Sequence, residues 1–189
     1  MIPFAPQKTD EISLVFAGDI LFDDNYSIMV KMKGRAGGGS LVEAGFDAAI
    51  LQDMRGADIV MVNNDFTYNT SGTPTAGRAF TFRARPEHAA LLSEMGADIV
   101  SLANNHVYDY GEISLLDTLD TLTAAGMPYV GAGRNLTEAV RPVYFVTENV
   151  KIAFLSATQI ERMENPDTKG ATETSPGVSS QSFATVSLG

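Results

Sequence analysis

A five-residue sequence, Gly-Ala-Asp-Ile-Val, occurs twice in this chain, at residues 56–60 and 96–100. Each copy follows a segment with helical spacing of apolar residues and opens a short apolar run. An earlier apolar run stops at Gly18-Asp19, which we interpret as a turn. Helices that alternate with short buried strands predict an α/β fold with largely parallel strands. We expect the apolar runs to form neighbouring strands of one sheet: residues 12–17, 57–62 and 97–102.

Further elements follow from the spacing of apolar residues. Leu115, Leu119 and Leu122 lie on one face of a predicted helix at 112–125, which Gly126 and Pro128 end. Residues 142–147 and 150–157 predict a hairpin-like pair of strands. The remaining expected elements are a mixed, helix-compatible segment at 22–33, a glycine-rich loop at 34–40, a helix at 41–56 (with Val42, Phe46, Ile50 and Met54 on one face), an edge strand at 79–83 and a helix at 86–95.

The length of 189 residues suits one domain with a substantial core. We divide the chain into an N-terminal extension at 1–11, an α/β domain at 12–163 and a tail at 164–189. The tail is polar and rich in Ser, Thr, Gly and Pro, so we expect irregular structure there.

The net charge of −10 argues against a nucleic-acid partner, because nucleic acid is itself negative. Cysteine is absent, which excludes disulfides, thiolate metal ligands and a cysteine nucleophile. The sequence contains no apolar run of about 18 residues, as a membrane-spanning helix needs. We also find no secretory signal at 1–10.

Polar side chains follow each of the three predicted strands. They are Asp19, the run Asn63-Asn64-Asp65 and the run Asn104-Asn105-His106. The carboxyl ends of parallel strands meet at one edge of a sheet, where ligand sites of such folds lie. Carboxylate, amide and imidazole groups suit divalent first-row metals. We therefore expect Asp19, Asp65 and Asn105 to lie close enough to share one or two metal ions.

Each of these residues also has a purely structural interpretation. Asp19 is a common turn or helix-cap residue, and Asn104 and Asn105 are common turn formers. His106 is compatible with a partly buried, hydrogen-bonded histidine. His88, the only other histidine, falls in the first turn of a predicted helix, and we expect it to be exposed.

Two charged features are open to two interpretations. Asp109 either caps the helix that follows it, which we favour, or orients His106. Arg78, Arg83 and Arg85 form a basic cluster in an acidic chain. The cluster is either a set of solvated loop charges or a binding site for an anionic substrate.

The segment Ser-Leu-Ala-Asn-Asn-His at 101–106, followed by Asp109-Tyr110-Gly111, resembles the hallmark of the bacterial CapA family of poly-γ-glutamate capsule synthesis proteins. Further similar segments lie at 16–19, 80–83, 130–135 and 151–155, and the resemblance runs from about residue 12 to about residue 178.

The resemblance implies a fold similar to calcineurin-like metallophosphoesterases, a sheet sandwich flanked by helices with a two-metal centre at the strand ends. It implies that Asp19 and Asn105 are metal ligands, together with Asn63 or Asp65. The metals of such a centre are divalent ions: Mn, Fe, Zn or Mg. His106 would face the phosphate as a catalytic residue, and we assign Asp109 to the catalytic group with it.

The chain also departs from the pattern of these families. Leu21 stands where the metallophosphoesterase motif normally has a histidine, and Asn63-Asn64-Asp65 replaces the usual Asn-Leu-Glu of the CapA second motif. No histidine follows His106. We therefore expect a domain that is incomplete at its C-terminus, with weak metal binding and slow or absent hydrolysis of generic phosphoesters.

By this resemblance the protein acts in the synthesis or export of a cell-envelope polymer. Its partners would be the capsule polymer or the synthase complex at the membrane. Its location would be extracytoplasmic, and membrane-associated in the full-length protein. The alternative is an active metal-dependent phosphoesterase or related hydrolase on an envelope substrate. Whether the chain is an enzyme stays open at the level of sequence.

Overall fold

The computed structural model describes residues 1–8, 10–159 and 169–180. Its centre is a four-stranded sheet in the order β2-β3-β6-β7, in which all neighbours run parallel. The strands are β2 (Leu14–Ile20), β3 (Ile59–Asn64), β6 (Ile99–Ser101) and β7 (Tyr129–Val130). The three apolar runs are therefore neighbouring strands, and the predicted α/β fold is confirmed.

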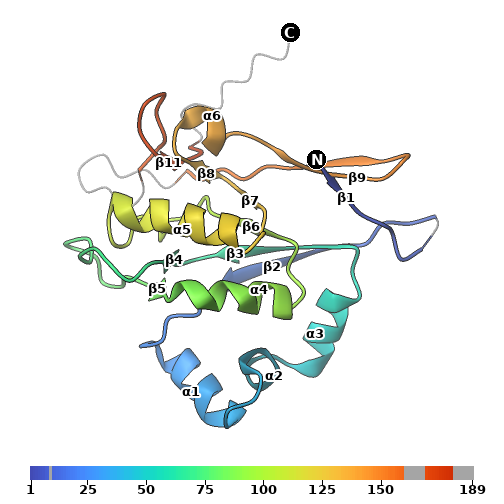
Figure 1. Ribbon diagram of the computed structural model, residues 1–189, viewed down its shortest axis with the longest axis horizontal. Coiled ribbons are helices and arrows are strands. Elements are labelled where there is room, and N and C mark those ends of the chain that lie inside the picture. The colour runs from blue at the N-terminus through green and yellow to red at the C-terminus, as the bar shows by residue number, and fades with distance from the viewer. Residues whose placement is uncertain (9, 160–168, 181–189) are drawn as a thin grey trace.

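A second sheet, in the order β1-β9-β10, lies alongside the first (Figure 1). It consists of β1 (Ile2–Pro3), β9 (Val143–Val146) and β10 (Lys151–Phe154). Because β9 and β10 pair antiparallel, the predicted hairpin is confirmed. Two short pairs complete the strands: β4 (Thr67–Tyr68) with β5 (Arg83–Ala84), and β8 (Ala132–Gly133) with β11 (Gly177–Val178).

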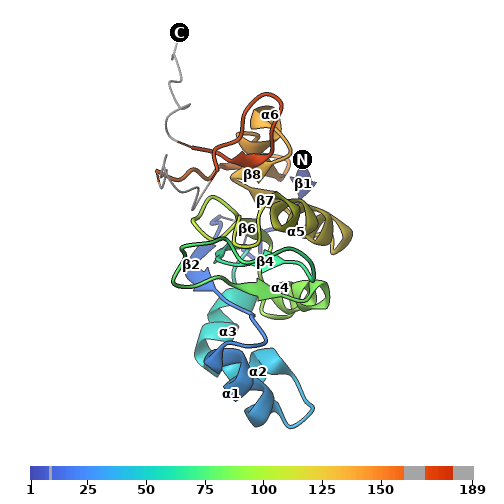
Figure 2. The ribbon, with the colours of Figure 1, turned by 90° about the vertical axis from the view of Figure 1, so that its left-hand side faces the viewer.

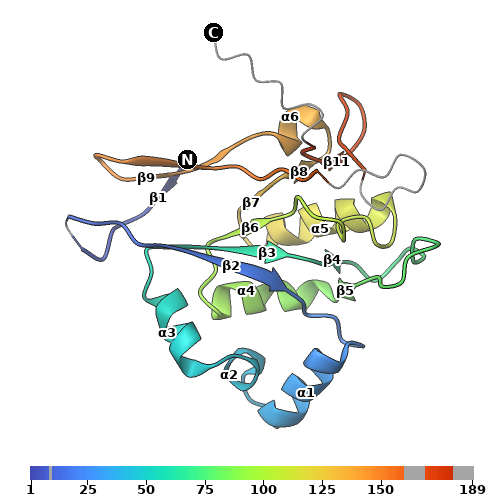
Figure 3. The ribbon, with the colours of Figure 1, turned by 180° about the vertical axis from the view of Figure 1, so that it is seen from behind.

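Helices cover the central sheet and extend away from it. They are α1 (Ser27–Ala36), α2 (Leu41–Gly45), α3 (Ala48–Arg55), the 3-10 turn η1 (Pro86–Ala89), α4 (Ala90–Glu94), α5 (Glu112–Ala124) and α6 (Leu136–Ala139). Figures 1 and 3 show α4 and α5 on the same side of strands β2 and β3. Figure 2 shows α1 and α6 at opposite ends of the molecule.

The predictions of a helix at 41–56 and of a loop at 34–40 are wrong in detail. The segment at 41–56 forms two helices, because the carboxylate of Asp47 accepts a hydrogen bond from the backbone N–H of Ala49 and so starts α3 as a new helix. The break turns Ile50 outward, where 53% of it is exposed. The expected loop at 34–40 begins only at Gly37, whose positive φ of 54° ends α1.

The core has two parts, one on each side of the central sheet. On the helix side, Leu115, Leu119 and Leu122 of α5 are almost fully buried, as their spacing predicted. On the other side, Ile59 and Ile99 of the central sheet pack with Phe145 and Phe154 of the hairpin. Complete burial of one such side chain contributes roughly 1.5–3 kcal/mol, so both faces stabilise the sheet.

The repeated pentapeptide has a structural explanation. The backbone N–H of Asp58 donates to the Ser13 carbonyl (3.1 Å), and the Asp58 carboxylate accepts from the Ser13 N–H (2.7 Å). Asp98 makes the same reciprocal pair with Val60, at 2.9 Å in both directions. Each repeated aspartate therefore fastens the start of its own strand to the neighbouring strand.

The turn predicted at Gly18-Asp19 is wrong. Strand β2 continues through these residues to Ile20, and its register against β3 shifts between Phe16 and Asp19. Phe16 pairs with Met61 while Asp19 pairs with Asn63, so β2 contains one extra residue. Such a bulge re-aims the side chains that follow it, and here it precedes Asp19.

Among the described residues, no helix is long and apolar enough to cross a membrane. The expected boundary at residue 163 lies outside the described part of the chain. Within the expected tail, residues 169–180 are described, and they include β11, which pairs with β8.

Candidate functional site

The carboxyl ends of β2 and β3 bring Asp19 and Asn63 side by side. The side-chain Nδ2 of Asn63 donates a hydrogen bond of 2.7 Å to Oδ1 of Asp19. The pairing follows from the bulge, which sets Asp19 opposite Asn63 in the register of the two strands. Asp19 is exposed, so its carboxylate is accessible to a ligand from solvent.

Asn104 braces the loop after β6 against the end of β3. Its Nδ2 donates to the carbonyl of Asn64 (2.9 Å) and to Oδ1 of Asn63 (3.1 Å). Its Oδ1 accepts from the backbone N–H of His106 (2.9 Å). The side chain is buried, and these bonds fix where the loop carrying His106 lies.

Asp65 follows β3 directly and faces both Asp19 and His106. Burial, followed by the negative charge of Asp19, raises the pKa of Asp65 to about 6, against the opposing positive charge of Arg78. Oδ2 of Asp65 lies 3.9 Å from Nε2 of His106. Asp65 therefore interacts with a second carboxylate and with an imidazole at this edge, where the order of the strands brings their three strand ends together.

The imidazole of His106 is held from its other side. Its Nδ1 lies 2.7 Å from Oδ2 of Asp109, and its ring centroid lies 4.6 Å from that of Phe82. Asp109 is fully buried and accepts a further hydrogen bond of 2.6 Å from the backbone N–H of Phe82. An ionised carboxylate can only accept, so Nδ1 of His106 carries the proton of this bond.

Asp109 does not cap the following helix, contrary to the interpretation we favoured. Helix α5 begins after Gly111, and no side chain caps it. The carboxylate is instead paired with His106 and with Arg78. The alternative, that Asp109 orients His106, agrees with this geometry.

The three arginines do not form one cluster. The side chain of Arg78 is only 6% exposed and contacts Asp109, so it is not a solvated loop charge. The guanidinium of Arg83 stacks over the ring of Tyr110 at 4.4 Å. Arg85 pairs with Asp24 at 2.7 Å.

His88 is buried rather than exposed, so that prediction is also wrong. Turn η1 directs its ring towards the segment after β2, where Nδ1 donates to the carbonyl of Phe22 at 3.3 Å. Its Nε2 lies 3.6 Å from Oδ1 of Asp24. The fold therefore keeps this histidine as an internal link between η1 and the end of β2.

The site thus brings Asp19, Asn63, Asp65 and His106 together. Asn105 lies in the same loop, and its backbone carbonyl accepts a hydrogen bond from Arg78. The oxygen and nitrogen donors of this set suit a divalent cation, and the repulsion between the two carboxylates is what a cation would relieve. Within the described ranges, no three histidine, aspartate or glutamate side chains form a ready metal cage.

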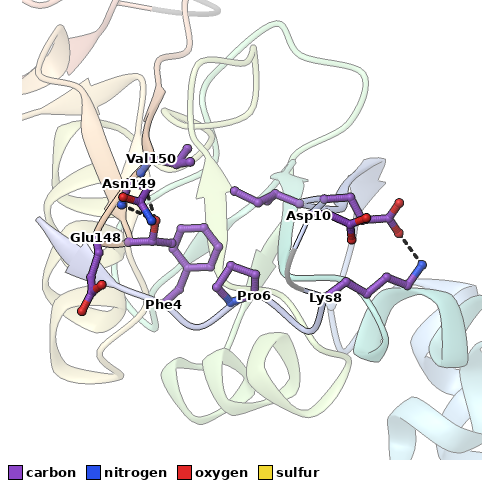
Figure 4. A pocket seen from close by; sticks show the side chains of 10 residues that line it. Phe4, Pro6, Lys8, Asp10, Glu148, Asn149 and Val150 are labelled. Atoms are coloured by element: carbon purple, nitrogen blue, oxygen red, sulfur yellow. Dashed lines mark hydrogen bonds and ion pairs between the residues drawn. The ribbon is translucent and has the colours of Figure 1, made fainter.

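A separate cavity of about 600 Å³ lies between the N-terminal segment and the turn of the β9–β10 hairpin (Figure 4). Phe4 lines it beside Glu148, Asn149 and Val150 of the hairpin turn, while Lys8 and Asp10 lie on the side away from that turn. None of the candidate site residues contributes to its lining.

Comparison with known proteins adds independent information. A family model described as "Bacterial capsule synthesis protein PGA_cap" matches residues 13–187. The PGA biosynthesis protein CapA of Bacillus subtilis is 29% identical over 154 residues, covering 80% of this chain and 38% of the relative. The capsule biosynthesis protein CapA of Bacillus anthracis is 36% identical over 75 residues, covering 40% and 18%. A probable polyglutamine synthesis accessory protein of Mycobacterium tuberculosis is 26% identical over 132 residues, covering 70% and 35%. The chain therefore spans well under half the length of these relatives.

Proposed function

This chain belongs to the bacterial capsule synthesis protein family, and from that premise we propose that it acts in the synthesis or export of a poly-γ-glutamate-type envelope polymer. The names of the relatives support this role, since they describe capsule, PGA and polyglutamine synthesis. The proposed partners are the polymer or its synthase complex at the membrane. The proposed location is extracytoplasmic, with membrane association in the full-length protein.

The site that serves this role is the edge formed by Asp19, Asp65 and His106. The observation that carries this assignment is the convergence of two carboxylates and an imidazole from three different strand ends. Asp19 and Asp65 would hold a divalent cation, with Asn105 and Asn63 as the other proposed ligands. A bound cation would polarise a substrate oxygen and lower the pKa of a bound water.

The role can be tested in the source bacterium by deleting the gene and measuring polymer at the cell surface. Complementation with the wild-type gene should restore the polymer, while Asp65→Asn should not. Asp53→Asn is the matched control, because it removes the same charge from the exposed face of α3. Full restoration by Asp65→Asn would show that the polymer role does not need this site.

A second candidate function, hydrolysis of a phosphoester or related envelope bond, is favoured by the His106–Asp109 pair. A histidine oriented by a buried carboxylate is typical of general acid–base catalysis. In this reaction His106 would donate a proton to the leaving oxygen or stabilise its negative charge, while Asp109 keeps the ring oriented. The test is turnover of an aryl phosphate with Mn²⁺. If His106→Ala abolishes the turnover, the result supports the hydrolase function. If the turnover survives this change, the hydrolytic activity does not depend on the His106 site.

A further inference from the structure

Only 6% of the Arg78 side chain is exposed, although the residue belongs to the polar segment between β4 and β5. Arginine is rarely buried unless its charge is paired, because removing the guanidinium from water is costly. Its Nη1 pairs with Oδ1 of Asp109, and its Nη2 donates to the backbone carbonyl of Asn105. The guanidinium therefore contacts the residue before His106 in the chain and the carboxylate that holds His106.

The two oxygens of Asp109 have separate partners. Oδ1 accepts from Arg78, while Oδ2 accepts from the backbone N–H of Phe82 and from Nδ1 of His106. This division leaves the carboxylate a single orientation. It also gives the buried carboxylate a positively charged partner, Arg78.

From this geometry we propose that Arg78 is a positioning residue that sets the tautomer and the orientation of the His106 ring. It acts through Asp109, which accepts the hydrogen bond from Nδ1–H, and through the Asn105 carbonyl, which fixes the peptide leading to His106. The consequence is that Nε2 is the nitrogen directed towards Asp65. The inference builds on the proposed function, in which His106 works in this site.

A role for Arg78 in binding an anionic substrate fits the geometry less well. An anion would have to displace Asp109 from the guanidinium, and this would leave a buried carboxylate without its countercharge. The side chain of Asp109 is fully buried and that of Arg78 is only 6% exposed, so an anion from solvent would also have to open the loop between β4 and β5.

The test is ¹⁵N NMR of the histidine side chains, at a pH well above the ordinary imidazole value of about 6.5. The chain has only two histidines, so the variant His106→Gln assigns the signals. In the wild type we expect His106 to be protonated at Nδ1. In Arg78→Met we expect the ratio of Nδ1–H to Nε2–H tautomers to fall by about tenfold. The reason is that the hydrogen bond from Nδ1–H to Asp109 is no longer stabilised by the positive charge of Arg78.

Arg134→Met is the matched control, since it removes an exposed arginine that pairs with Asp120 away from the site. Arg78→Lys is the second variant, because it keeps the charge and is the safer choice if Arg78→Met fails to fold. We expect it to restore most of the Nδ1–H tautomer without restoring the bond to Asn105.

An unchanged tautomer ratio in a folded Arg78→Met variant would overturn the inference. If that variant does not fold, a wild-type His106 protonated mainly at Nε2 would overturn it equally. The NMR result does not depend on turnover or on polymer production. A tautomer shift in a chain that neither hydrolyses phosphoesters nor supports polymer synthesis would therefore uphold the inference while the proposed function fails.

Discussion

Asp65 and Asp19 face each other across the ends of two adjacent strands, and burial together with the charge of Asp19 raises the pKa of Asp65 to about 6. A carboxyl group whose pKa rises on folding costs stability once it ionises. The cost is absent below the unfolded pKa of about 4 and complete above pH 6. Burial and the repulsion from Asp19 therefore both disfavour the ionised form of Asp65, and a bound cation would offset this cost.

This relationship predicts the behaviour of Asp65→Asn in the presence of a chelator. The neutral amide costs less to bury than a carboxylate and also removes the repulsion with Asp19, so at pH 7 the variant should be more stable than the wild type by ~1 kcal/mol, after allowance for solvent screening. At about pH 4 the difference should disappear. Thermal unfolding at both pH values measures it, with Asp53→Asn as the control. A variant that is less stable than the wild type at pH 7 would contradict the prediction.

The two aspartates of the repeated pentapeptide should respond to pH in opposite directions. Hydrogen bonds from the backbone of Ser13 and then Gln7 lower the pKa of Asp58. Ionised Asp58 therefore stabilises the fold at neutral pH, and this stabilisation is lost in acid. Burial raises the pKa of Asp98, so its ionisation costs stability as pH rises. At pH 7 Asp58→Asn should destabilise the chain more than Asp98→Asn does. In acid the difference between the two losses of stability should become smaller. Melting curves from pH 3 to pH 7 are the measurement, and equal losses at every pH would refute this difference.

Asn104 should be needed for the geometry of the His106 loop. Asn104→Ala removes the brace between the loop and β3, leaving the buried carbonyl of Asn64 without this donor. The expected loss is about 1–3 kcal/mol of unfolding free energy. Urea denaturation measures the loss, and hydrogen exchange at the His106 amide should accelerate by more than exchange in α5. A uniform acceleration would mean that Asn104 has no local role.

Helix α5 and helix α3 provide a test of the core. Leu122→Ala should cost about 2–5 kcal/mol, because the side chain is fully buried. Ile50→Ala should change stability by about 0.5 kcal/mol or less, because Ile50 faces solvent. Chemical denaturation of both variants checks the pair. A large loss of unfolding free energy in Ile50→Ala would contradict this and would favour the single helix that the sequence pattern predicted at 41–56.

Much of the fold could be predicted from the sequence because its signals are local. The buried face of α5 and the strands at the repeated pentapeptide follow from hydrophobic spacing alone. The edge that carries Asp19, Asp65 and His106 then follows from the parallel order of the strands. These inferences need no knowledge of which residues meet across the fold.

The remaining features depend on contacts between distant segments. The bulge before Asp19 appears only when β2 is paired with β3. One extra residue in a short apolar run does not change the sequence pattern in a recognisable way. The burial of His88 depends on where η1 packs. Asp109 pairs with Arg78 instead of capping a helix, and Arg78 lies 31 residues away in the sequence.

We propose that Asp19 and Asp65 hold a divalent cation at the carboxyl edge of the sheet, and calorimetric titration with Mn²⁺ tests this proposal most directly. The wild-type chain, Asp19→Asn, Asp65→Asn and the control Asp53→Asn would be titrated at pH 7. We expect binding by the wild type and by Asp53→Asn, with affinity about tenfold or more weaker in each of the two site variants, because each loses one anionic ligand. Equal affinity in all four proteins, or no binding by the wild type, would contradict the account.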